Sequence, residues 1–199
     1  MRVSDIHGAG FGDANAKFRV YLATPPPMDA YQQLTRIQPL QAGDIDQIYR
    51  HCGNGWRKIF NVYAKLLFAL PSSHFSFAVM ASSWQQFRDQ QLLHANSGTA
   101  LCFDSPSLTD DTKTMHLIAG RTLAKQLLAQ GLQANLQWLS SEFAVDPARQ
   151  LLVTPFFDYR QLNNEKIVVS ARLLQLLAAQ TMDMSPYIAI VHNHGQIES

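Results

Sequence analysis

Apolar and polar residues along the chain recur with helical spacing in some segments and alternate in others. The clearest helical pattern covers 56–70, where apolar residues recur every three or four positions and form one stripe. Similar spacing predicts further helices over 84–94, 121–130 and 163–180. Pro71 ends the first helix and Gly131 ends the third, because proline cannot continue a helix and glycine favours its C-terminal turn.

Strand patterns lie between these helices. Short runs rich in β-branched and aromatic residues predict strands over 18–23, 74–80, 115–119, 135–139, 150–154 and 187–192. The apolar run 100–103 fits neither pattern clearly. Strands that alternate with helices indicate an α/β fold with three layers. We therefore expect a mainly parallel central sheet of four to five strands, with helices on both of its faces.

The length and composition narrow the class of protein. The 199 residues contain no internal repeat and no low-complexity linker, so a single α/β domain over 1–199 is expected, with flexible ends at 1–16 and 193–199. Lysine and arginine number 16 and acidic residues 15, so binding of duplex DNA would need a local basic patch. The oligomeric state is not predicted.

Membrane association is not expected, because no apolar run approaches the roughly 20 residues that span a bilayer. The first residues also lack the pattern of a signal peptide. Cys52 and Cys102 have no nearby partner, which is typical of reduced thiols in a cytoplasmic protein.

The loops after the strands are where a ligand is expected, because parallel sheets bind ligands beyond the carboxyl ends of their strands. This rule selects the loops 24–29, 81–84, 120–122 and 154–163. The polar residues in these loops that we consider candidates for binding are Thr24, Asp29, Ser82, Arg121, Tyr159, Arg160 and Asn163.

The run 158–163 has the most varied chemistry. Arg160 and nearby amides could bind a phosphate, and Tyr159 could stack on a base. Asp158 is the candidate catalytic residue, as a general base. The alternative is structural: Asp158 or Asn163 caps the following helix, and Arg160 pairs with a surface carboxylate.

A second candidate anion site precedes the helix over 56–70. Asn54 and Arg57 lie at its start, where backbone N–H groups point outward. In the alternative interpretation Asn54 is a cap, Trp56 belongs to the core and Arg57 is solvated. Likewise, Gly120 before Arg121 is explained equally well by a tight turn.

No metal or cofactor site is predicted. The seven histidines do not cluster, and the His192-Asn193-His194 motif lacks a third ligand nearby. Ser82 and Ser83 lack the G-x-S-x-G context of a nucleophile elbow.

The order of four segments resembles that of the uracil-DNA glycosylase superfamily, in its mismatch-specific and SMUG-like branches. The segments are a strand ending in a proline-containing loop (20–25), a Gly-Asn turn before an aromatic and basic helix (53–60), a strand, glycine and helix (115–128), and a strand with a proline-containing loop (151–163). The resemblance covers roughly 18–177. It implies that the protein binds a nucleobase, nucleotide or single-stranded nucleic acid.

The chain departs from that family at the residues that carry its chemistry. The family's first loop has an Asn or Asp that acts on the attacking water, whereas Thr24 and three prolines stand here and Asp29 is the nearest carboxylate. The family's later loop usually has His or Asn, then Pro and Ser; here Thr154-Pro155-Phe156 lacks both polar residues. Catalysis by the family's usual residues is therefore not expected.

Two other functions remain open. An α/β enzyme for a phosphorylated or carboxylated metabolite would bring Arg57, Arg121 and Arg160 together around an anion. A non-enzymatic interaction protein would expose the following aromatic residues to a partner: Phe156, Phe157 and Tyr159.

Overall fold

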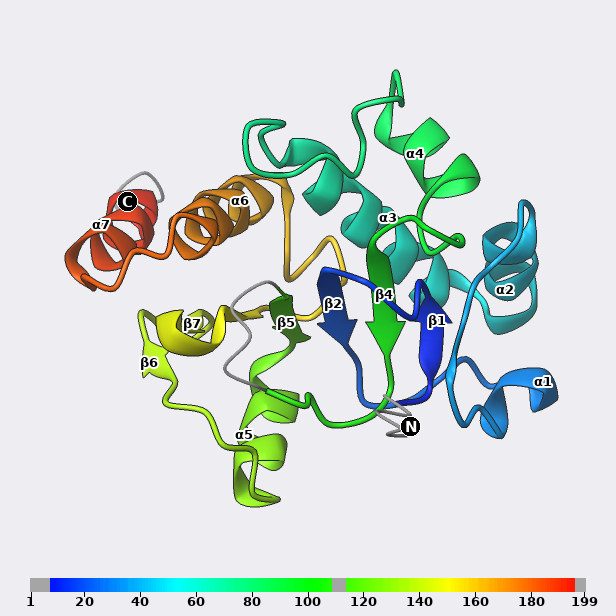
Figure 1. Ribbon diagram of the computed structural model, residues 1–199, viewed down its shortest axis with the longest axis horizontal. Helices are drawn as coiled ribbons and strands as arrows, with labels where there is room; N and C mark the ends of the chain where they lie inside the picture. Colours follow the sequence, from blue (N-terminus) through cyan, green and yellow to red (C-terminus); the bar gives the residue numbers. More distant parts are fainter. Residues whose placement is uncertain (1–7, 109–113, 196–199) are drawn as a thin grey trace, which may run out of the picture.

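The computed structural model describes residues 8–108 and 114–195. Within them, eight strands form one mixed sheet in the order β3-β1-β4-β2-β5-β8-β7-β6 (Figure 1). The strands are β1 (Gly10–Gly12), β2 (Phe18–Tyr21), β3 (Ile37–Gln38), β4 (Thr99–Cys102), β5 (Met115–Ala119), β6 (Gln137–Trp138), β7 (Ala144–Asp146) and β8 (Leu151–Thr154). The helices are α1 (Asp29–Gln32), α2 (Asp44–Cys52), α3 (Asn54–Ala69), α4 (Trp84–Gln90), α5 (Arg121–Ala129), α6 (Asn164–Ala178) and α7 (Ser185–Gly195), with a 3-10 turn at Pro147–Arg149.

The centre of the sheet consists of parallel strands in the order β4-β2-β5-β8. Val20 of β2 lies between Leu101 of β4 and Leu117 of β5, and all three side chains are fully buried. Strands buried on both faces need apolar residues at nearly every position. This requirement explains why β2, β5 and β8 were recognisable in the sequence.

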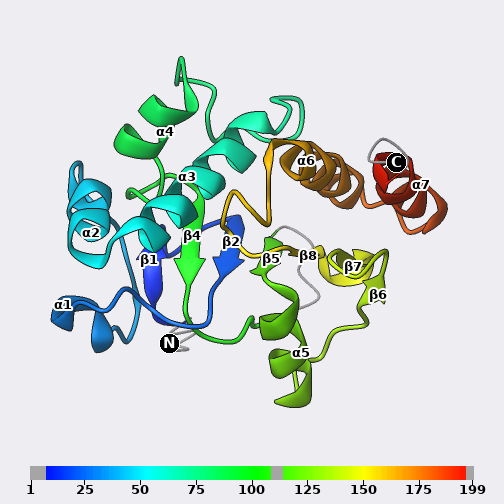
Figure 2. The ribbon, with the colours of Figure 1, turned by 180° about the vertical axis from the view of Figure 1, so that it is seen from behind.

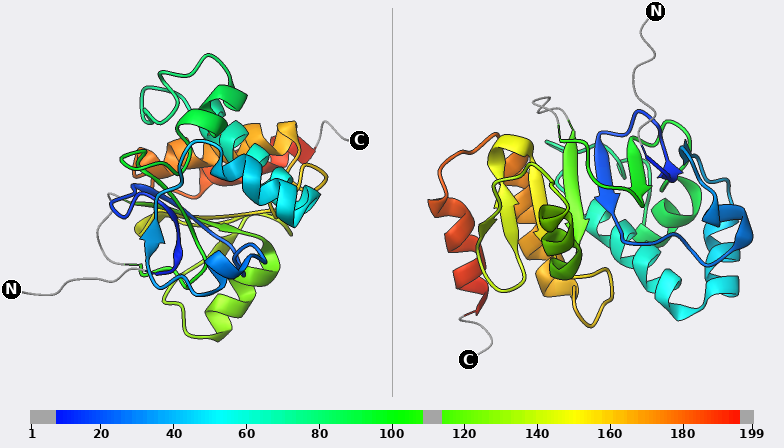
Figure 3. Two further views of the ribbon diagram at one scale, coloured as in Figure 1. Left: turned by 90° about the vertical axis from the view of Figure 1, so that its right-hand side faces the viewer. Right: turned by 90° about the horizontal axis from the view of Figure 1, so that it is seen from below.

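Helices cover both faces of these strands, as the edge-on view shows (Figure 3, left). The helices α3, α4 and α6 share one hydrophobic core with one face, and α5 packs through Ala124 and Leu127 on the other. Seen from behind, α6 and α7 lie side by side near the β8-β7-β6 end (Figure 2). The predicted layered α/β architecture is thus confirmed.

The connections that leave β2 and β5 run toward opposite edges of the sheet. From β2 it passes through α3 to β4 on one side, and from β5 through α5 to β8 on the other. Right-handed crossovers in opposite directions place their helices on opposite faces, and the reversal is a topological switch point. The carboxyl ends of β2 and β5 therefore flank a natural position for a ligand.

The prediction of four to five mainly parallel strands was wrong. Antiparallel pairs extend the sheet at both ends: β1 with β4, and β7 with both β8 and β6. These added strands have only two or three residues each. A strand of that length shows little alternation of apolar and polar residues, and of these four strands β6 alone lies within a predicted strand, 135–139.

Two predicted strands do not exist. The segment 74–80 forms turns, in which Phe75 and Phe77 pack inward while Val79 and Met80 are exposed. The segment 187–192 lies in α7, where Tyr187, Ile190 and Val191 face the core with helical spacing. Both segments are rich in strand-forming residues, but packing against neighbouring helices determines their conformation.

The other predicted elements are present with slightly different ends. The run 100–103 corresponds to the central strand β4, whereas α1 and α2 were not predicted. Of the ends expected to be flexible, 1–7 and 196–199 lie outside the described residues, Gly10–Gly12 forms β1, and α7 extends to Gly195. Within 8–108 and 114–195, no helix is both long enough and apolar enough to cross a membrane.

Candidate functional site

A pocket of about 490 Å³ opens at the switch point. Most of its residues lie at or after the carboxyl ends of β2, β5 and β8, as the rule for parallel sheets predicts, and Ser141 and Glu142 come from the turn between β6 and β7. We call this pocket the crevice. It is lined by Ala23, Ala119, Gly120, Arg121, Thr122, Leu123, Gln126, Ser141, Glu142, Pro155, Phe156 and Gln161.

Gly120 joins β5 to α5 at the floor of the crevice. Its backbone has φ +118°, a conformation that residues other than glycine rarely adopt. Its N–H donates a hydrogen bond to the Thr154 carbonyl over 2.9 Å. The tight turn lets α5 begin directly at the crevice. Gly120 is the N-cap and provides no side chain, so no side-chain cap covers the first N–H groups of α5. This helix end carries a partial positive charge.

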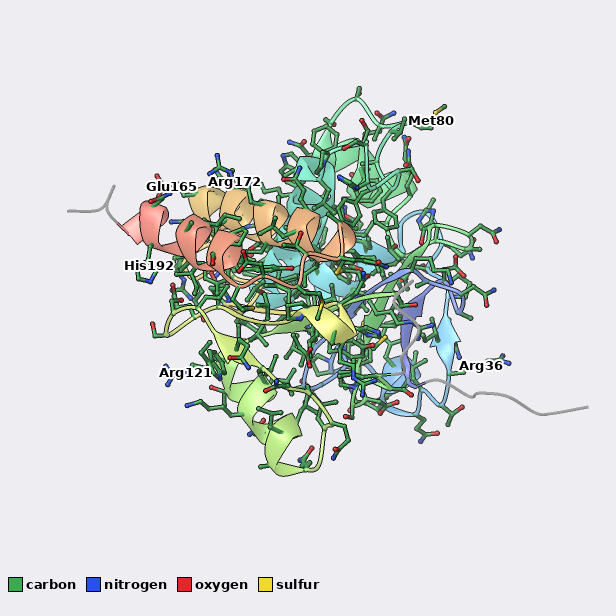
Figure 4. All side chains as sticks on the ribbon, turned by 60° about the vertical axis from the view of Figure 1, so that its left-hand side comes forward. Arg36, Met80, Arg121, Glu165, Arg172 and His192 are labelled. Atoms are coloured by element: carbon green, nitrogen blue, oxygen red, sulfur yellow. The ribbon has the colours of Figure 1, made fainter. Side chains whose placement is uncertain are left out.

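Arg121 connects α5 to the turn between β6 and β7. Its Nη1 donates to the Ser141 carbonyl over 3.2 Å, and its guanidinium lies 5.9 Å from the centre of the Trp138 ring. Figure 4 shows Arg121 on the α5 side of the sheet, with Glu165, Arg172 and His192 on the other side. A guanidinium has five N–H donors, and Ser141 uses one of them. Arg121 can therefore bind an anion in addition.

Glu142 connects the same turn to the other helical layer. Its Oε2 lies 2.8 Å from Lys166 Nζ on α6. Glu142 also lines the crevice, so the charged lining residues are one cation, Arg121, and one anion, Glu142. The crevice is thus suited to a polar ligand with both donors and acceptors.

Phe156 supplies an aromatic surface to the crevice. The side chain directly follows buried Pro155 and remains 37% exposed. Gln126 of α5 and Gln161 of the loop after β8 bring amides to the same pocket. A planar ring could stack on Phe156, and amides both donate and accept hydrogen bonds to a ring edge.

Asp158 is not a lining residue of the crevice, and its carboxylate pairs with the side chains of Lys58 and Arg160. Its Oδ2 accepts from Lys58 Nζ over 2.8 Å and from Arg160 Nη2 over 3.1 Å, and its Oδ1 accepts from the Arg160 backbone N–H over 3.0 Å. The hydrogen bonds from Arg160 first, and then that from Lys58, hold the pKa of this carboxyl far below its ordinary value. Such a carboxylate is a weak general base near neutral pH. The geometry therefore favours the structural alternative for Asp158.

The other residues of 158–163 also make contacts that hold the loop and the start of α6 in place. The Asp158 carbonyl accepts from the backbone N–H groups of Gln161 and Leu162, both over 2.8 Å. Tyr159 is exposed, with Lys58 Nζ 4.8 Å from its ring centre. Asn163 Oδ1 caps α6 by accepting from the Lys166 N–H over 2.9 Å. The loop is therefore fixed by its own contacts and by α3.

The remaining candidate residues are dispersed. Thr24 is exposed beside Ala23 at the crevice, and Asp29 is exposed in the first turn of α1. Asn54 is the first residue of α3, whose cap is Gly53, and Arg57 is exposed one turn later. Ser82 donates to Gln86 Oε1 over 2.8 Å at the start of α4.

Of the three arginines proposed to converge, Arg121 lines the crevice, whereas Arg57 and Arg160 are not among its lining residues. Among the three aromatic residues proposed for a partner surface, Phe157 is fully buried, Phe156 faces the crevice and Tyr159 is exposed. The structure thus brings neither the three arginines of the proposed metabolite enzyme nor the three aromatic residues of the proposed partner surface together in one site.

Several crevice residues were not among the sequence candidates. The spacing of Thr122 and Gln126 places both on one face of a helix that follows a strand and a glycine, a signal that was readable. Ser141 and Glu142 gave no such signal, because β7, which follows them, was not predicted, although the strand predicted over 135–139 contains β6. Within the described side chains no group of three or more His, Cys, Asp or Glu could bind a metal ion; the side chain of His194 lies outside them.

The protein therefore has an α/β fold with a pocket at the switch point of its sheet. The chain belongs to the DUF6942 family, a family of unknown function, whose model matches residues 9–175. No curated protein and no solved structure matches the chain.

Proposed function

We propose that this protein binds a nucleobase or nucleotide-like ligand in the crevice. The observation that carries the proposal is the exposed face of Phe156 in the same pocket as Arg121 and the uncapped start of α5. An aromatic face next to an anion site matches the two ends of a nucleotide.

The phosphate would lie at the amino end of α5. Backbone N–H groups there have no side-chain cap, and Arg121 adds a full positive charge. The base would stack on Phe156, with its edge toward Gln126 or Gln161. The pocket volume of about 490 Å³ is within the range of roughly 300–1,000 Å³ common for small-molecule sites.

The resemblance to the uracil-DNA glycosylase superfamily supports the same class of ligand. It also bears on catalysis, because Thr24 and Pro155 occupy the loops in which that family carries its reactive residues. Asp158 cannot readily replace them, since hydrogen bonds from Lys58 and Arg160 occupy both of its carboxylate oxygens and lower its pKa, which makes it a weak base. We therefore propose ligand binding without base excision by these residues.

Two assays test this proposal. Calorimetric titration with uridine monophosphate, uridine and inorganic phosphate should show tightest binding for the nucleotide, since it reaches both ends of the crevice. A parallel assay with uracil- and hypoxanthine-containing single-stranded DNA should show no base release. Absence of binding by all three small ligands would overturn the proposed function, and base release would overturn its catalytic part.

A further inference from the structure

A second cavity, of about 620 Å³, lies at the opposite end of the parallel strands. Its lining comes from Lys17 just before β2, from the turns at 74–77 and from the connection 90–98 between α4 and β4. We call it the amino-end cavity. It shares no lining residue with the crevice.

The lining of the amino-end cavity carries one formal positive charge, that of Lys17, and no negative charge. Lys17, His74 and His94 line it, and none of its lining residues is Asp or Glu. The nearby Asp13 is occupied by backbone groups: its Oδ2 accepts from the Gly98 N–H over 3.1 Å and its Oδ1 from the Asn15 N–H over 2.8 Å.

Aromatic rings form the apolar part of the cavity. Phe75 and Phe77 both line it, with ring centres 6.1 Å apart. The edge-to-face contact of Phe77 with Phe18 of β2, at 5.7 Å, fixes its ring to the sheet. The Phe77 ring also lies close to the backbone at Gly98. A Cβ at that position would be only 3.2 Å from the ring, so glycine makes this approach possible.

The connection that carries His94 has a costly backbone conformation. Leu93 and Asn96 have φ of +62° and +59°, and a positive φ is rare for a bulky residue such as leucine. Thr99 holds the turn, since its Oγ1 accepts from the Leu93 N–H over 3.1 Å. Strained, well-supported turns of this kind cluster at ligand sites. The strained turn that carries His94 therefore supports a ligand site at this cavity.

We propose that the amino-end cavity binds an anion carried on an aromatic body, of the class of an aryl phosphate. Lys17 supplies the charge, the imidazoles of His74 and His94 and nearby amides supply hydrogen bonds, and Phe75 and Phe77 contact the ring. This site is independent of the function proposed for the crevice.

Phenyl phosphate is a suitable probe, followed by NMR. The imidazole signals of His74 and His94 report on the amino-end cavity, and the indole N–H of Trp138 reports on the crevice. We expect the two histidine signals to shift with saturation. Lys17→Gln and His94→Gln should each weaken this binding on the order of tenfold. The exposed control variants Lys125→Gln and His192→Gln, and the crevice variant Arg121→Gln, should leave it unchanged.

Unmoved signals of His74 and His94 at high phenyl phosphate concentration would overturn the proposal, whatever Trp138 shows. Equal affinity of wild type and Lys17→Gln would overturn it as well. Inorganic phosphate should bind more weakly than phenyl phosphate, and equal affinities would refute the role of the two phenylalanine rings.

Discussion

Lys58 Nζ of α3 lies 2.8 Å from Asp158 Oδ2 in the loop after β8, and the pair joins positions 100 residues apart in the chain. Their side chains are only 16% and 12% exposed, so solvent screens the pair weakly. The same carboxylate holds Arg160 and shapes the loop. Asp158 thus fixes the loop that presents Phe156 and Gln161 to the crevice.

Replacing Asp158 should destabilise the fold. Asp158→Asn leaves Lys58 without its partner in a mostly buried position, and we expect a loss of about 2 kcal/mol in the free energy of unfolding. Urea denaturation near pH 7 measures it. Glu165→Gln, at an exposed carboxylate on α6, is the matched control and should cost less than about 0.5 kcal/mol. Equal effects of the two changes would contradict the role of Asp158.

The stabilisation by Asp158 should also depend on pH. The pKa of its carboxyl is lower in the folded protein than its ordinary value, so the unfolded chain takes up the proton first as the pH falls. The contribution should be fully present above about pH 5 and decrease below about pH 4. The difference in unfolding free energy between wild type and Asp158→Asn should therefore shrink in acid. A constant difference from pH 7 to pH 3 would be inconsistent with a lowered pKa.

His116 should make the fold sensitive to mild acid. Its side chain is 5% exposed, its Nδ1 is hydrogen-bonded to the Tyr21 hydroxyl over 2.8 Å, and burial, then Arg19, lowers its pKa from 6.5 to about 4. Between those values the unfolded chain binds a proton that the folded protein does not. We expect a loss of about 3 kcal/mol as the pH falls from 7 to 4.

NMR titration of the imidazole measures this pKa directly, and His116→Gln should remove most of the loss in stability between pH 6.5 and 4. The exposed His192→Gln is the control and should retain that loss. A titration midpoint of His116 near 6.5 would disprove the explanation.

Gly120 should be required for its backbone conformation. A Cβ there would lie 3.9 Å from Phe156, an ordinary contact, so Gly120→Ala should cost about 1–2 kcal/mol through its positive φ alone. Gly55→Ala, in α3 with open space around it, should instead stabilise by about 0.5 kcal/mol. Thermal or urea denaturation compares the two. If both changes stabilise the protein, the strain at Gly120 is absent.

The sequence predicted most of the central elements because they are long or mostly apolar, but it did not assign the central strand β4. The strands β2, β5 and β8 are mostly apolar, with Arg19 and His116 as interruptions, and the stripe of α3 is readable over four turns. The short strands β1 and β3 are defined by pairing with distant segments, which no local pattern records, and β7 has only three residues. Tyr187, Ile190 and Val191 were misread as a strand because the same residue types serve both structures.

The position of the site was more predictable than its residues. The rule for parallel sheets selected the loops after β2, β5 and β8, and with them Arg121, but it also selected 81–84, which follows no strand in the structure. It could not select Glu142, which lies just before the unpredicted strand β7. The varied side chains of 158–163 made Asp158 the catalytic candidate, and its partner Lys58 lies in a distant segment that a local pattern does not record.

Binding of uridine monophosphate by crevice variants tests the central proposal most directly. Titration monitored by Trp138 fluorescence, which reports on the surroundings of Arg121, should give weakening on the order of tenfold for both Phe156→Ala and Arg121→Gln. Tyr159→Ala and Arg172→Gln, at exposed residues outside the crevice lining, should bind as the wild type does. Wild-type protein that fails to bind the nucleotide, or crevice variants that bind it equally well, would contradict a nucleotide site at the switch point.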